Sequence, residues 1–361
     1  MKNVLVTGGA GFIGSNFIRH ALAQSSGVRI VNLDALTYAG SPRNLDGLPG
    51  PDRHLFVRGD ICDAPLVGAL LKTHRIDTIV HFAAETHVDR SILAPEKFVQ
   101  TNVLGTFTLL EAARREWLEE ERADPRERRF HHISTDEVFG SLSAGEEAFR
   151  EETPYKPNSP YAASKAASDH LVRAYAQTYG LPVTITNCSN NYGPCQFPEK
   201  LIPLTILNAL EGRPLPVYGD GRQIRDWLYV EDHCRAIWLV LQNGRPGEMY
   251  NLGGGNQWTN IDLVKTLCRI LDELRPGSPH CPHESLITFV ADRPGHDRRY
   301  AMDIGKVTRD LGWSPCEGLE TGLRKTAGWY LDNLEWVQAI RKERRYQQWL
   351  ETNYAERGGK A

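Results

Sequence analysis

The chain has 361 residues, of which 41% are hydrophobic and 24% charged, and its formal net charge is −3. This length suits about two domains of ~150 residues each, and the proportions exclude a wholly disordered chain. With 42 Lys and Arg against 45 Asp and Glu, no overall basic field exists to collect nucleic acid or anionic lipid. An anionic ligand must therefore be held by a local cluster of groups that attract it, because the chain as a whole is not basic.

No apolar run approaches the ~18 residues of a membrane-spanning helix, which favours a soluble protein without a membrane partner. The seven cysteines include no CxxC pair, so we expect reduced thiols in a cytoplasmic protein and neither a disulfide framework nor a metal site. Adjacent His131 and His132 lie in a strand-like stretch, where their side chains point to opposite faces and do not chelate one ion together.

Short apolar segments alternate with helical patterns through the first half of the chain. We predict strands at 4–6, 28–33, 55–57, 78–82, 129–134 and 183–186. We predict helices at about 12–24, 64–74, 96–121 and 160–179. This order predicts an α/β fold with a doubly wound parallel sheet, helices on both faces and right-handed crossovers.

A glycine-rich turn joins the first strand to the first helix. Gly8, Gly11 and Gly14 have the spacing GxxGxxG, which lets the backbone turn sharply and lets a helix N-terminus approach a pyrophosphate. Asp34 ends the second strand about 20 residues later, where a carboxylate meets the adenosine ribose hydroxyls and repels a 2′-phosphate. The pattern predicts a Rossmann-type domain that binds NAD.

The end of the third strand offers a second acid to the same ligand. Asp60 and Ile61 are expected to border the adenine. Helix capping by Asp60 or Asp63 is the alternative for these carboxylates.

After Cys188, prolines and glycines break the alternation into short pieces. A helix at 230–242 and a strand at 249–252 could return to the main sheet. We therefore expect a Rossmann-type domain at 1–189, to which 230–257 returns, and a C-terminal helix or tail at 336–361. A smaller mixed α/β substrate-binding domain is expected at 190–229 and 258–335.

Ser159 and Pro160 are typical of a helix start and place Tyr161 and Lys165 on one helical face, at i and i+4. A nearby ammonium, the helix N-terminus and an oxidised nicotinamide would lower the pKa of the tyrosine from its ordinary ~10 and make it a base. For the motif alone, a surface Tyr/Lys pair is the alternative.

Thr135, Asp136 and Glu137 follow the fifth strand, at the edge where doubly wound sheets bind ligands. Both carboxyl groups can serve one substrate only if the chain turns after Thr135. Asp136, kept protonated by enclosure, is then a general acid, and ionised Glu137 a general base. A solvated strand end is the alternative.

These three motifs together resemble the extended short-chain dehydrogenase/reductase superfamily. Within it the chain is similar to the dTDP-glucose 4,6-dehydratase family over roughly residues 1–330, with matching stretches at 34–40, 83–91, 187–194, 225–233 and 292–297. Related 4-epimerases lack the acid/base pair, and GDP-mannose dehydratases carry Ser-Glu in place of Asp136 and Glu137. Ala35 and the pair Cys195 and Gln196 depart from the family pattern.

The resemblance implies three sets of site residues. The catalytic set is Thr135, Asp136, Glu137, Tyr161 and Lys165. The expected NAD contacts are Gly8, Gly11, Phe12, Ile13, Gly14, Asp34, Thr37, Asp60, Ile61, Ala83, Ala84, Thr101, Tyr161, Lys165 and Asn191. The expected sugar-nucleotide contacts are Thr86, Thr135, Asn190, Lys200, Leu201, Pro216, Tyr218, Arg225, Asn260, Arg293 and His296.

The guanidinium groups of Arg225 and Arg293 also suit a diphosphate, with structural ion pairs as the alternative. The resemblance further implies a homodimer formed through a four-helix bundle, for which the helices at 96–121 and 160–179 are candidates.

The implied reaction is a lyase reaction that converts dTDP-α-D-glucose to dTDP-4-keto-6-deoxy-D-glucose and water, for deoxysugar and rhamnose biosynthesis. Tyr161, assisted by Lys165, removes the C4 hydroxyl proton while hydride passes from C4 to NAD. Glu137 then takes the C5 proton as Asp136 protonates the leaving C6 hydroxyl, and the hydride returns to C6. The alternatives are a UDP-glucose 4,6-dehydratase, a UDP-sugar 4-epimerase, or a catalytically silent NAD-binding scaffold.

Overall fold

The computed structural model describes residues 1–292 and 295–342. Its main sheet has seven parallel strands in the order β10-β6-β5-β4-β1-β2-β3. Their bounds are β1 Asn3–Thr7, β2 Arg29–Asp34, β3 His54–Arg58, β4 Thr78–His81, β5 Arg129–Thr135, β6 Val183–Cys188 and β10 Met249–Leu252. Most of these strands are buried along nearly their whole length, because helices cover both faces of the sheet.

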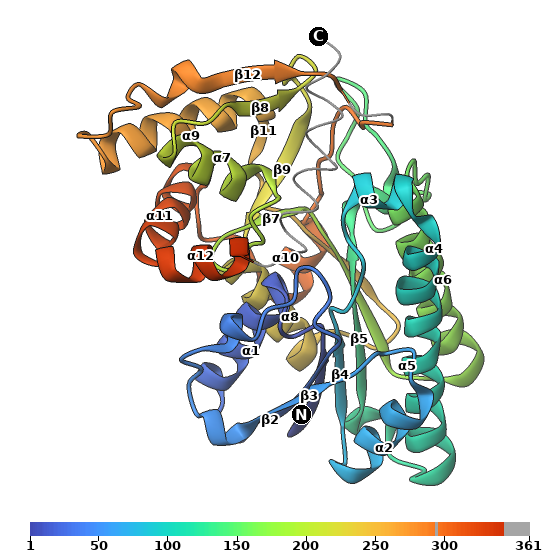
Figure 1. Cartoon of the computed structure of the whole chain (residues 1–361). Helices are drawn as coiled ribbons and strands as arrows, with labels where there is room; N and C mark the ends of the chain where they lie inside the picture. Colours follow the sequence, from blue (N-terminus) through green and yellow to red (C-terminus); the bar gives the residue numbers. More distant parts are fainter. Residues whose placement is uncertain (293–294, 343–361) are drawn as a thin grey trace.

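Helices pack on both faces of this sheet (Figure 1). On one face, α1 (Phe12–Gln24) and α8 (Val230–Asn243) form a core with the strands that includes Phe17 and Ile18. On the other face lie α2 (Ala64–Thr73), α5 (Gly105–Ala113) and α6 (Pro160–Tyr179). The expected fold class, a doubly wound parallel sheet with a smaller second domain, is confirmed.

A smaller lobe sits on the carboxyl side of the sheet (Figure 1). It contains a mixed three-stranded sheet, β11-β9-β7, and a parallel pair, β12-β8. Its strands are β7 Asn190–Tyr192, β8 Leu215–Tyr218, β9 Ile224–Tyr229, β11 Gln257–Thr259 and β12 Ile287–Val290. Its helices are α7 Leu201–Leu210, α9 Asn260–Leu274, α11 Leu319–Asp332 and α12 Leu334–Lys342.

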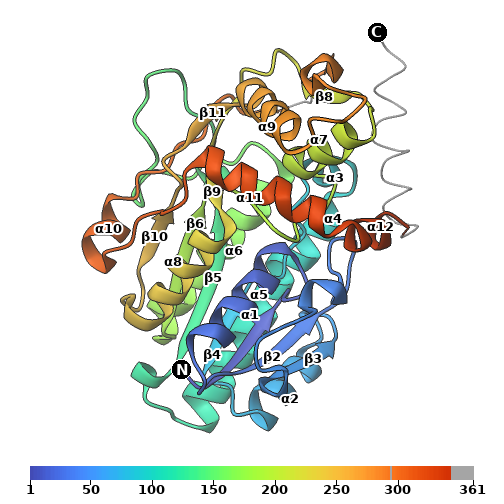
Figure 2. The same cartoon turned by 90° about the vertical axis from the view of Figure 1, so that its left-hand side faces the viewer.

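The chain crosses between the lobes several times. After β9 it forms α8 against the main sheet, and β10 then pairs with β6 before the chain returns to β11. Figure 2 shows α11 running beneath α9 and α7, with which it shares a core. Short helical segments join these elements: η1 Pro42–Leu45, η2 Pro51–Arg53, α3 Val88–Leu93, η5 Pro125–Glu127, η6 Asp136–Phe139, η7 His283–Leu286 and α10 Gly305–Leu311.

The helix predicted at 96–121 is correct in place but not uniform. It consists of α4 (Pro95–Phe98), the wider π turns η3 (Val99–Leu104), α5, and a second π segment, η4 (Arg114–Glu120). Gly105 begins α5 directly against Ile61, whose Cδ1 would lie 2.4 Å from an added Cβ. A side chain at that position would require the Ile61 side chain to shift.

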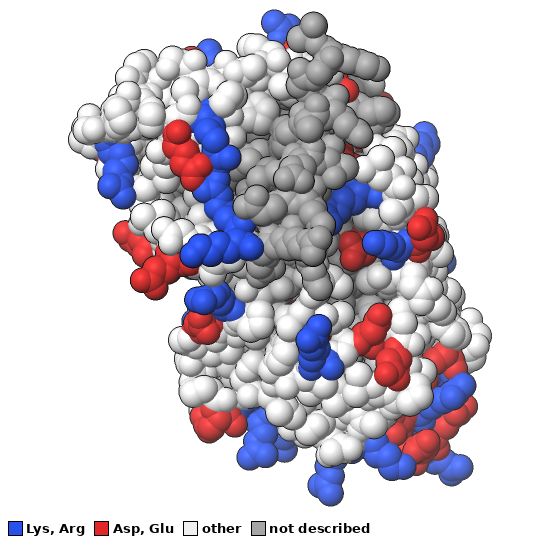
Figure 3. Space-filling view, in the orientation of Figure 1, with Lys and Arg blue, Asp and Glu red and all other residues white. Residues whose placement is uncertain are grey.

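Two surface features bear on partners. Among the described residues, no helix is long and apolar enough to cross a membrane. In Figure 3, both charge signs are interspersed over the larger lobe.

Of the tail predicted at 336–361, residues 336–342 belong to α12, and 343–361 lie outside the described residues.

Candidate active site

The glycine turn after β1 is shaped by close backbone approach. Gly8 has φ +71°, and a Cβ there would lie 2.6 Å from the Ala83 nitrogen, while a Cβ at Gly14 would lie 2.3 Å from the Gly8 oxygen. Gly11 is the N-cap of α1, and no described side chain caps this helix. The first-turn residues of α1 line the cavity described below, so their unpaired N–H groups are available to an anionic ligand.

Asp34 is held rigidly at the end of β2. Its Oδ2 accepts a hydrogen bond from the Ala10 N–H at 2.8 Å, and its Oδ1 accepts one from the Leu36 N–H at 2.8 Å. Burial raises the pKa of this carboxyl, although the two N–H groups oppose that effect. Each carboxylate oxygen has a second lone pair, so Asp34 retains acceptor capacity for two ribose hydroxyls.

The two acids after β3 have separate surroundings. Asp63 caps α2 by accepting from the Leu66 N–H at 3.0 Å. Asp60 accepts from the Cys62 N–H at 2.8 Å and lines the cavity described below. Only Asp60 is thus positioned for a ligand.

One large cavity runs along the carboxyl ends of the parallel strands and brings the predicted motifs together. It is lined by every residue expected to contact NAD, including the three glycines of the turn. It is also lined by all five expected catalytic residues. Of the expected sugar-nucleotide contacts, those that line it are Thr86, Thr135, Asn190 and Lys200.

The sequence analysis missed several lining residues, among them Glu85, Gln196 and Glu199. The Glu199 side chain is fully buried and lies 3.4 Å from an Arg90 guanidinium nitrogen and 3.8 Å from His87 Nε2. Gln196 donates to the Asn191 carbonyl at 2.9 Å, and its Oε1 has no partner among the described residues. Glu85 lies within the stretch 83–91 that matches the family, whereas the chain near 194–200 is irregular and no periodic pattern signals Gln196 or Glu199.

The chain turns directly after Thr135, as two convergent carboxyl groups require. Thr135 is the N-cap of η6, and its hydroxyl accepts a hydrogen bond from the Glu137 N–H at 3.3 Å. Gly140 ends the turn with φ +89°, where an added Cβ would lie 2.5 Å from the Lys156 oxygen. Asp136 and Glu137 therefore both line the cavity instead of pointing to opposite faces of a strand.

Asp136 is 2% exposed, and its Oδ2 accepts no hydrogen bond from any described residue. The Thr135 hydroxyl donates to its Oδ1 at 3.2 Å. Burial, followed by the charge of Glu137, raises the pKa of Asp136 well above its ordinary value, and Arg225 opposes this rise. A neutral carboxylic acid at this position can donate a proton.

Tyr161 lies in the first turn of α6, which begins as the sequence predicts. Ser159 caps the helix by accepting from the Ala162 N–H at 3.1 Å, and Pro160 follows at its first position. The expected lowering of the Tyr161 pKa depends on an oxidised nicotinamide as well as on Lys165 and the helix N-terminus, so it stays a prediction. Burial, followed by the charge of Glu137, raises the pKa of Tyr161 well above its ordinary value.

Lys165 is fully buried, and its ammonium group points to the main chain of the sheet. Its Nζ donates to the Ile133 carbonyl at 2.8 Å and lies 3.4 Å from His132 Nε2. Burial lowers the pKa of Lys165 to about 8, with Asp169 opposing the shift. The lysine is therefore held close to its titration point near neutral pH.

A buried polar network lies behind Lys165. The Asp169 carboxylate accepts from the Ser134 hydroxyl at 2.7 Å and from the Tyr155 hydroxyl at 2.8 Å. His132 Nε2 lies 3.2 Å from the other Asp169 oxygen. These contacts place an anion one helical turn beyond the lysine and fix the face of α6 that carries it.

The other expected sugar-nucleotide contacts lie outside the described lining of this cavity. They are Leu201, Pro216, Tyr218, Arg225, Asn260 and His296. Arg225 is 5% exposed, donates to the Ile224 and Asp297 carbonyls at 2.9 and 3.0 Å, and lies 4.4 Å from the Tyr300 ring centre. Arg293 lies outside the described residues.

The parallel sheet, the glycine cradle and the buried Tyr161/Lys165 pair define an enzyme of the extended short-chain dehydrogenase/reductase class. The sequence matches the family described as GDP-mannose 4,6 dehydratase over residues 5–326. It is 54% identical to dTDP-glucose 4,6-dehydratase 1 of Escherichia coli (strain K12) over 359 residues, covering 97% of this chain and 98% of that protein. The chain belongs to the dTDP-glucose 4,6-dehydratase family.

Other relatives agree with this placement. A dTDP-glucose 4,6-dehydratase of Xanthomonas campestris pv. campestris (strain B100) is 58% identical over 343 residues, covering 94% of this chain and 96% of that protein. DesIV of Streptomyces venezuelae, a dTDP-glucose 4,6-dehydratase solved with NAD and TYD bound, has a TM-score of 0.84 and 48% identity, covering 94% of this chain and 99% of that one. A UDP-glucose 4-epimerase from Thermotoga maritima is more distant, with a TM-score of 0.79 and 28% identity over 92% of this chain and 99% of that one.

Proposed function

We propose that this protein converts dTDP-α-D-glucose to dTDP-4-keto-6-deoxy-D-glucose and water. The observation that carries the proposal is that one cavity holds a dinucleotide cradle, a Tyr/Lys pair and two adjacent carboxyl groups, of which Asp136 has a raised pKa. Relatives that are 53–58% identical over nearly their whole length carry the name of this activity.

The residues present fit NAD. Phosphates would meet the open N-terminus of α1, where the glycines allow the close backbone packing that shapes the turn. Asp34, which lines the cavity, would accept hydrogen bonds from the ribose hydroxyls. Bound NAD would supply a reversible two-electron acceptor, so that oxidation at C4 and reduction at C6 would balance within one turnover.

Three side chains move the protons. Tyr161 takes the proton of the C4 hydroxyl, and the nearby Lys165 ammonium stabilises the phenolate that results. Oxidation at C4 makes the C5 proton acidic, because the carbanion that forms there is conjugated with the new carbonyl. Glu137 removes that proton, and Asp136 donates its own to the C6 hydroxyl, which leaves as water.

Asp136 and Glu137 need opposite protonation states, and their environments differ accordingly. Asp136 is buried, and the ionised Glu137 beside it favours the neutral acid. Glu137 is only half-buried at the mouth of the turn. General acid and base steps of this kind contribute ~10² to 10⁴ each in rate.

We propose that the second lobe binds the nucleotide. Asn190 Oδ1 in the cavity and Asn260 Oδ1 on the second lobe are buried without a partner among the described residues. Tyr218 lies with its ring 6.3 Å from the His296 ring. The proposed substrate set consists of these residues together with Thr86, Thr135, Lys200, Leu201, Pro216, Arg225 and Arg293, the last of which lies outside the described residues. The proposed domain bounds remain 1–189 with 230–257, and 190–229 with 258–335.

The activity is tested by incubating purified protein with dTDP-glucose and, separately, with UDP-glucose. The 4-keto-6-deoxy product is measured by its alkaline absorbance, and the expected result is faster turnover of dTDP-glucose. Formation of only a 4-epimer would refute dehydration. Unchanged turnover of a Tyr161→Phe variant would indicate that the Tyr/Lys pair is not catalytic.

We also propose that two chains associate through the outer face of the helices after β4. Large apolar side chains are exposed there, including Leu93 at 72%, Val99 at 57% and Phe107 at 41%. Burying such a patch against a second copy removes apolar surface from water. Tyr179 at the end of α6 is also exposed.

The 4-keto group of the product can itself be reduced, and it makes epimerisation at the neighbouring carbons possible. We therefore propose a place in deoxysugar biosynthesis, with rhamnose as one end product. All seven cysteines are unpaired in the described structure, which suits a reducing compartment such as the cytoplasm.

A further inference from the structure

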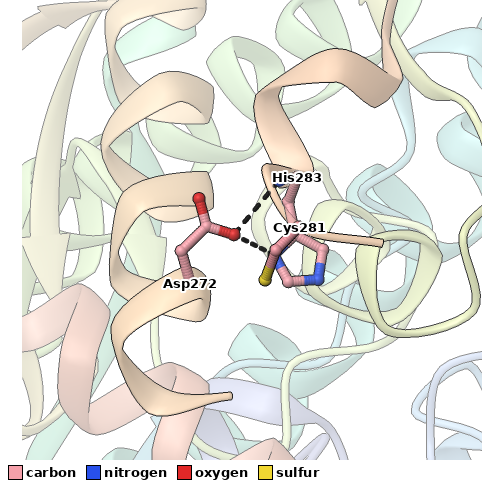
Figure 4. Close-up of side chains that lie close together, drawn as sticks. All are labelled: Asp272, Cys281 and His283. Atoms are coloured by element: carbon pink, nitrogen blue, oxygen red, sulfur yellow. Dashed lines mark hydrogen bonds and ion pairs between the residues drawn. The ribbon is translucent and has the colours of Figure 1, made fainter. Parts of the chain in front are cut away.

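Three side chains with different donor atoms meet at the end of α9, away from the described lining of the active-site cavity (Figure 4). Asp272 lies in the last turn of α9, and Cys281 and His283 lie at the start of η7. One ligand atom from each lies within 4.8 Å of the other two. The cluster therefore joins the helix to the chain that leads into β12.

The contacts within the cluster are close. His283 Nδ1 lies 2.5 Å from Asp272 Oδ1 and 3.9 Å from Cys281 Sγ. The His283 N–H also donates to Asp272 Oδ1, at 3.1 Å. Because the His283 side chain is fully buried, its ring has little freedom to turn away from the other two groups.

The donor set has the chemistry of a zinc site. Thiolate, imidazole and carboxylate are the three protein ligands of Zn²⁺, and three such ligands with one open position form a common site. Two nitrogen or oxygen ligands of one tetrahedral Zn²⁺ lie about 3.3 Å apart, given Zn–N and Zn–O bonds of about 2.0 Å. Asp272 and His283 need to separate by less than about 1 Å to reach this spacing.

A second contact orients the imidazole as metal-binding histidines require. His283 Nε2 lies 3.2 Å from the Ser278 hydroxyl oxygen. When Nδ1 binds a metal, Nε2 carries the proton and donates it to a neighbouring oxygen, which fixes the ring. The Ser278 hydroxyl can accept that bond, or donate when Nδ1 holds the proton instead.

We propose that Asp272, Cys281 and His283 bind one Zn²⁺ ion, with water in the fourth position. Cys281 is exposed, so the ion can enter from solvent and keep a water ligand. When the ion binds, the Cys281 thiol releases one proton to solvent, and the neutral imidazole of His283 exchanges its Nδ1 proton for one on Nε2. Neither oxidation nor a further reactant is required.

The location indicates what the ion would do. The bridged loop spans 272–283 and leads directly into β12, which pairs with β8, the strand that carries Pro216 and Tyr218. A metal bridge across this loop restricts the unfolded chain and stabilises the edge of the smaller lobe. The bound ion should therefore raise thermal stability without taking part in the reaction.

The test uses the untagged full chain, stripped with a chelator and titrated with Zn²⁺ or Co²⁺ alone. We expect one ion per chain, a thiolate-to-cobalt charge-transfer band, and a rise in Tm with Zn²⁺. Cys281→Ser should remove the charge-transfer band and weaken Zn²⁺ binding at least tenfold, whereas Cys316→Ser, at another exposed cysteine, should change neither. Ser278→Ala should weaken binding by about tenfold through the imidazole.

Because His283 is buried and its replacement could unfold the protein, Cys281→Ser is the variant that decides whether the proposal stands. Absence of Zn²⁺ binding to the wild-type chain would overturn the proposal. Equal binding by wild type and Cys281→Ser, or equal losses in Cys281→Ser and Cys316→Ser, would overturn it as well. Dehydratase activity is measured separately and is expected to stay unchanged in Cys281→Ser.

Discussion

Replacing Asp136 with asparagine tests the proposed acid with almost no change in shape. Asparagine keeps an oxygen that can accept the Thr135 hydrogen bond but has no proton to give to a leaving hydroxyl. Because a general acid contributes ~10² to 10⁴ in rate, we expect kcat for dehydration to fall by that factor. Binding of NAD should change little, since Asp34 and the glycine turn are untouched.

The same variant has a stability signature that depends on the raised pKa of Asp136. Unfolded aspartate titrates at ~3.9, whereas burial raises the pKa of folded Asp136 well above that value. Between these two values the folded chain binds more protons, so its free energy of unfolding falls as the pH rises. Each unit of pKa difference corresponds to about 1.4 kcal/mol, and Asp136→Asn should remove this loss.

The assay is therefore a pair of measurements. Product formation is followed by alkaline absorbance, and Tm is compared between wild type and Asp136→Asn at pH 5 and pH 8. The Tm of Asp136→Asn should exceed that of wild type by more at pH 8 than at pH 5. Full dehydratase activity in the variant, or a gain that shrinks as pH rises, would refute the assignment of Asp136 as a buried neutral acid.

Asp226 provides a matched control because it is also buried, at 1% exposure, with a raised pKa that burial causes. Unlike Asp136, it accepts hydrogen bonds from several backbone N–H groups, including that of Asn256 at 3.0 Å. In Asp226→Asn, an amide NH2 group, which is a donor, replaces one of the carboxylate oxygens that accept hydrogen bonds from those backbone N–H groups. It should therefore lower Tm where Asp136→Asn raises it.

Three further results are expected. Gly14→Ala should abolish NAD binding measured by calorimetry, because its Cβ would lie 2.3 Å from the Gly8 oxygen; unchanged affinity would contradict the cradle. Lys165→Met should lose activity. Because burial lowers the pKa of Lys165 from 10.5 to about 8, the free energy of unfolding of wild type should rise by about 3 kcal/mol relative to that of Lys165→Met between about pH 8 and pH 10.5. Denaturant titrations that show no such trend would argue against a buried ammonium. Leu93→Glu combined with Phe107→Glu should give monomers in analytical ultracentrifugation, and a persistent dimer would exclude this face.

The nucleotide half of the site could be predicted from sequence because its geometry depends on local features. Gly8, Gly11 and Gly14 sit on one strand-turn-helix unit, and Tyr161 and Lys165 on one helical face, so spacing alone relates them. The turn after Thr135 was required by the chemistry of two adjacent acids, and η6 supplies it.

The smaller lobe was less predictable because its elements are short and its contacts are long-range. β7, β8, β11 and β12 have three or four residues each, too few to show a period. The helix α7 was not predicted because Pro203 was interpreted as a break, although a proline in the first turn is compatible with a helix. The burial of Tyr161, which raises its pKa, is a long-range property that the helical spacing of Tyr161 and Lys165 does not report. Cys281 and His283 gave no signal because a search for CxxC pairs passes over a Cys-x-His pair.

Arg225 and Asp226 lie on β9 in the smaller lobe, yet both act on the proton affinity of Asp136 at the end of a strand in the larger lobe. The strength of this acid is therefore a property of two separate structural units held together. If the lobes part, water reaches the carboxyl group and its pKa returns toward that of an ordinary aspartate. Docking of the lobes and readiness for proton donation are thus thermodynamically linked, and a mutation at the lobe junction far from any reacting atom would favour the ionised form of Asp136, which has no proton to donate.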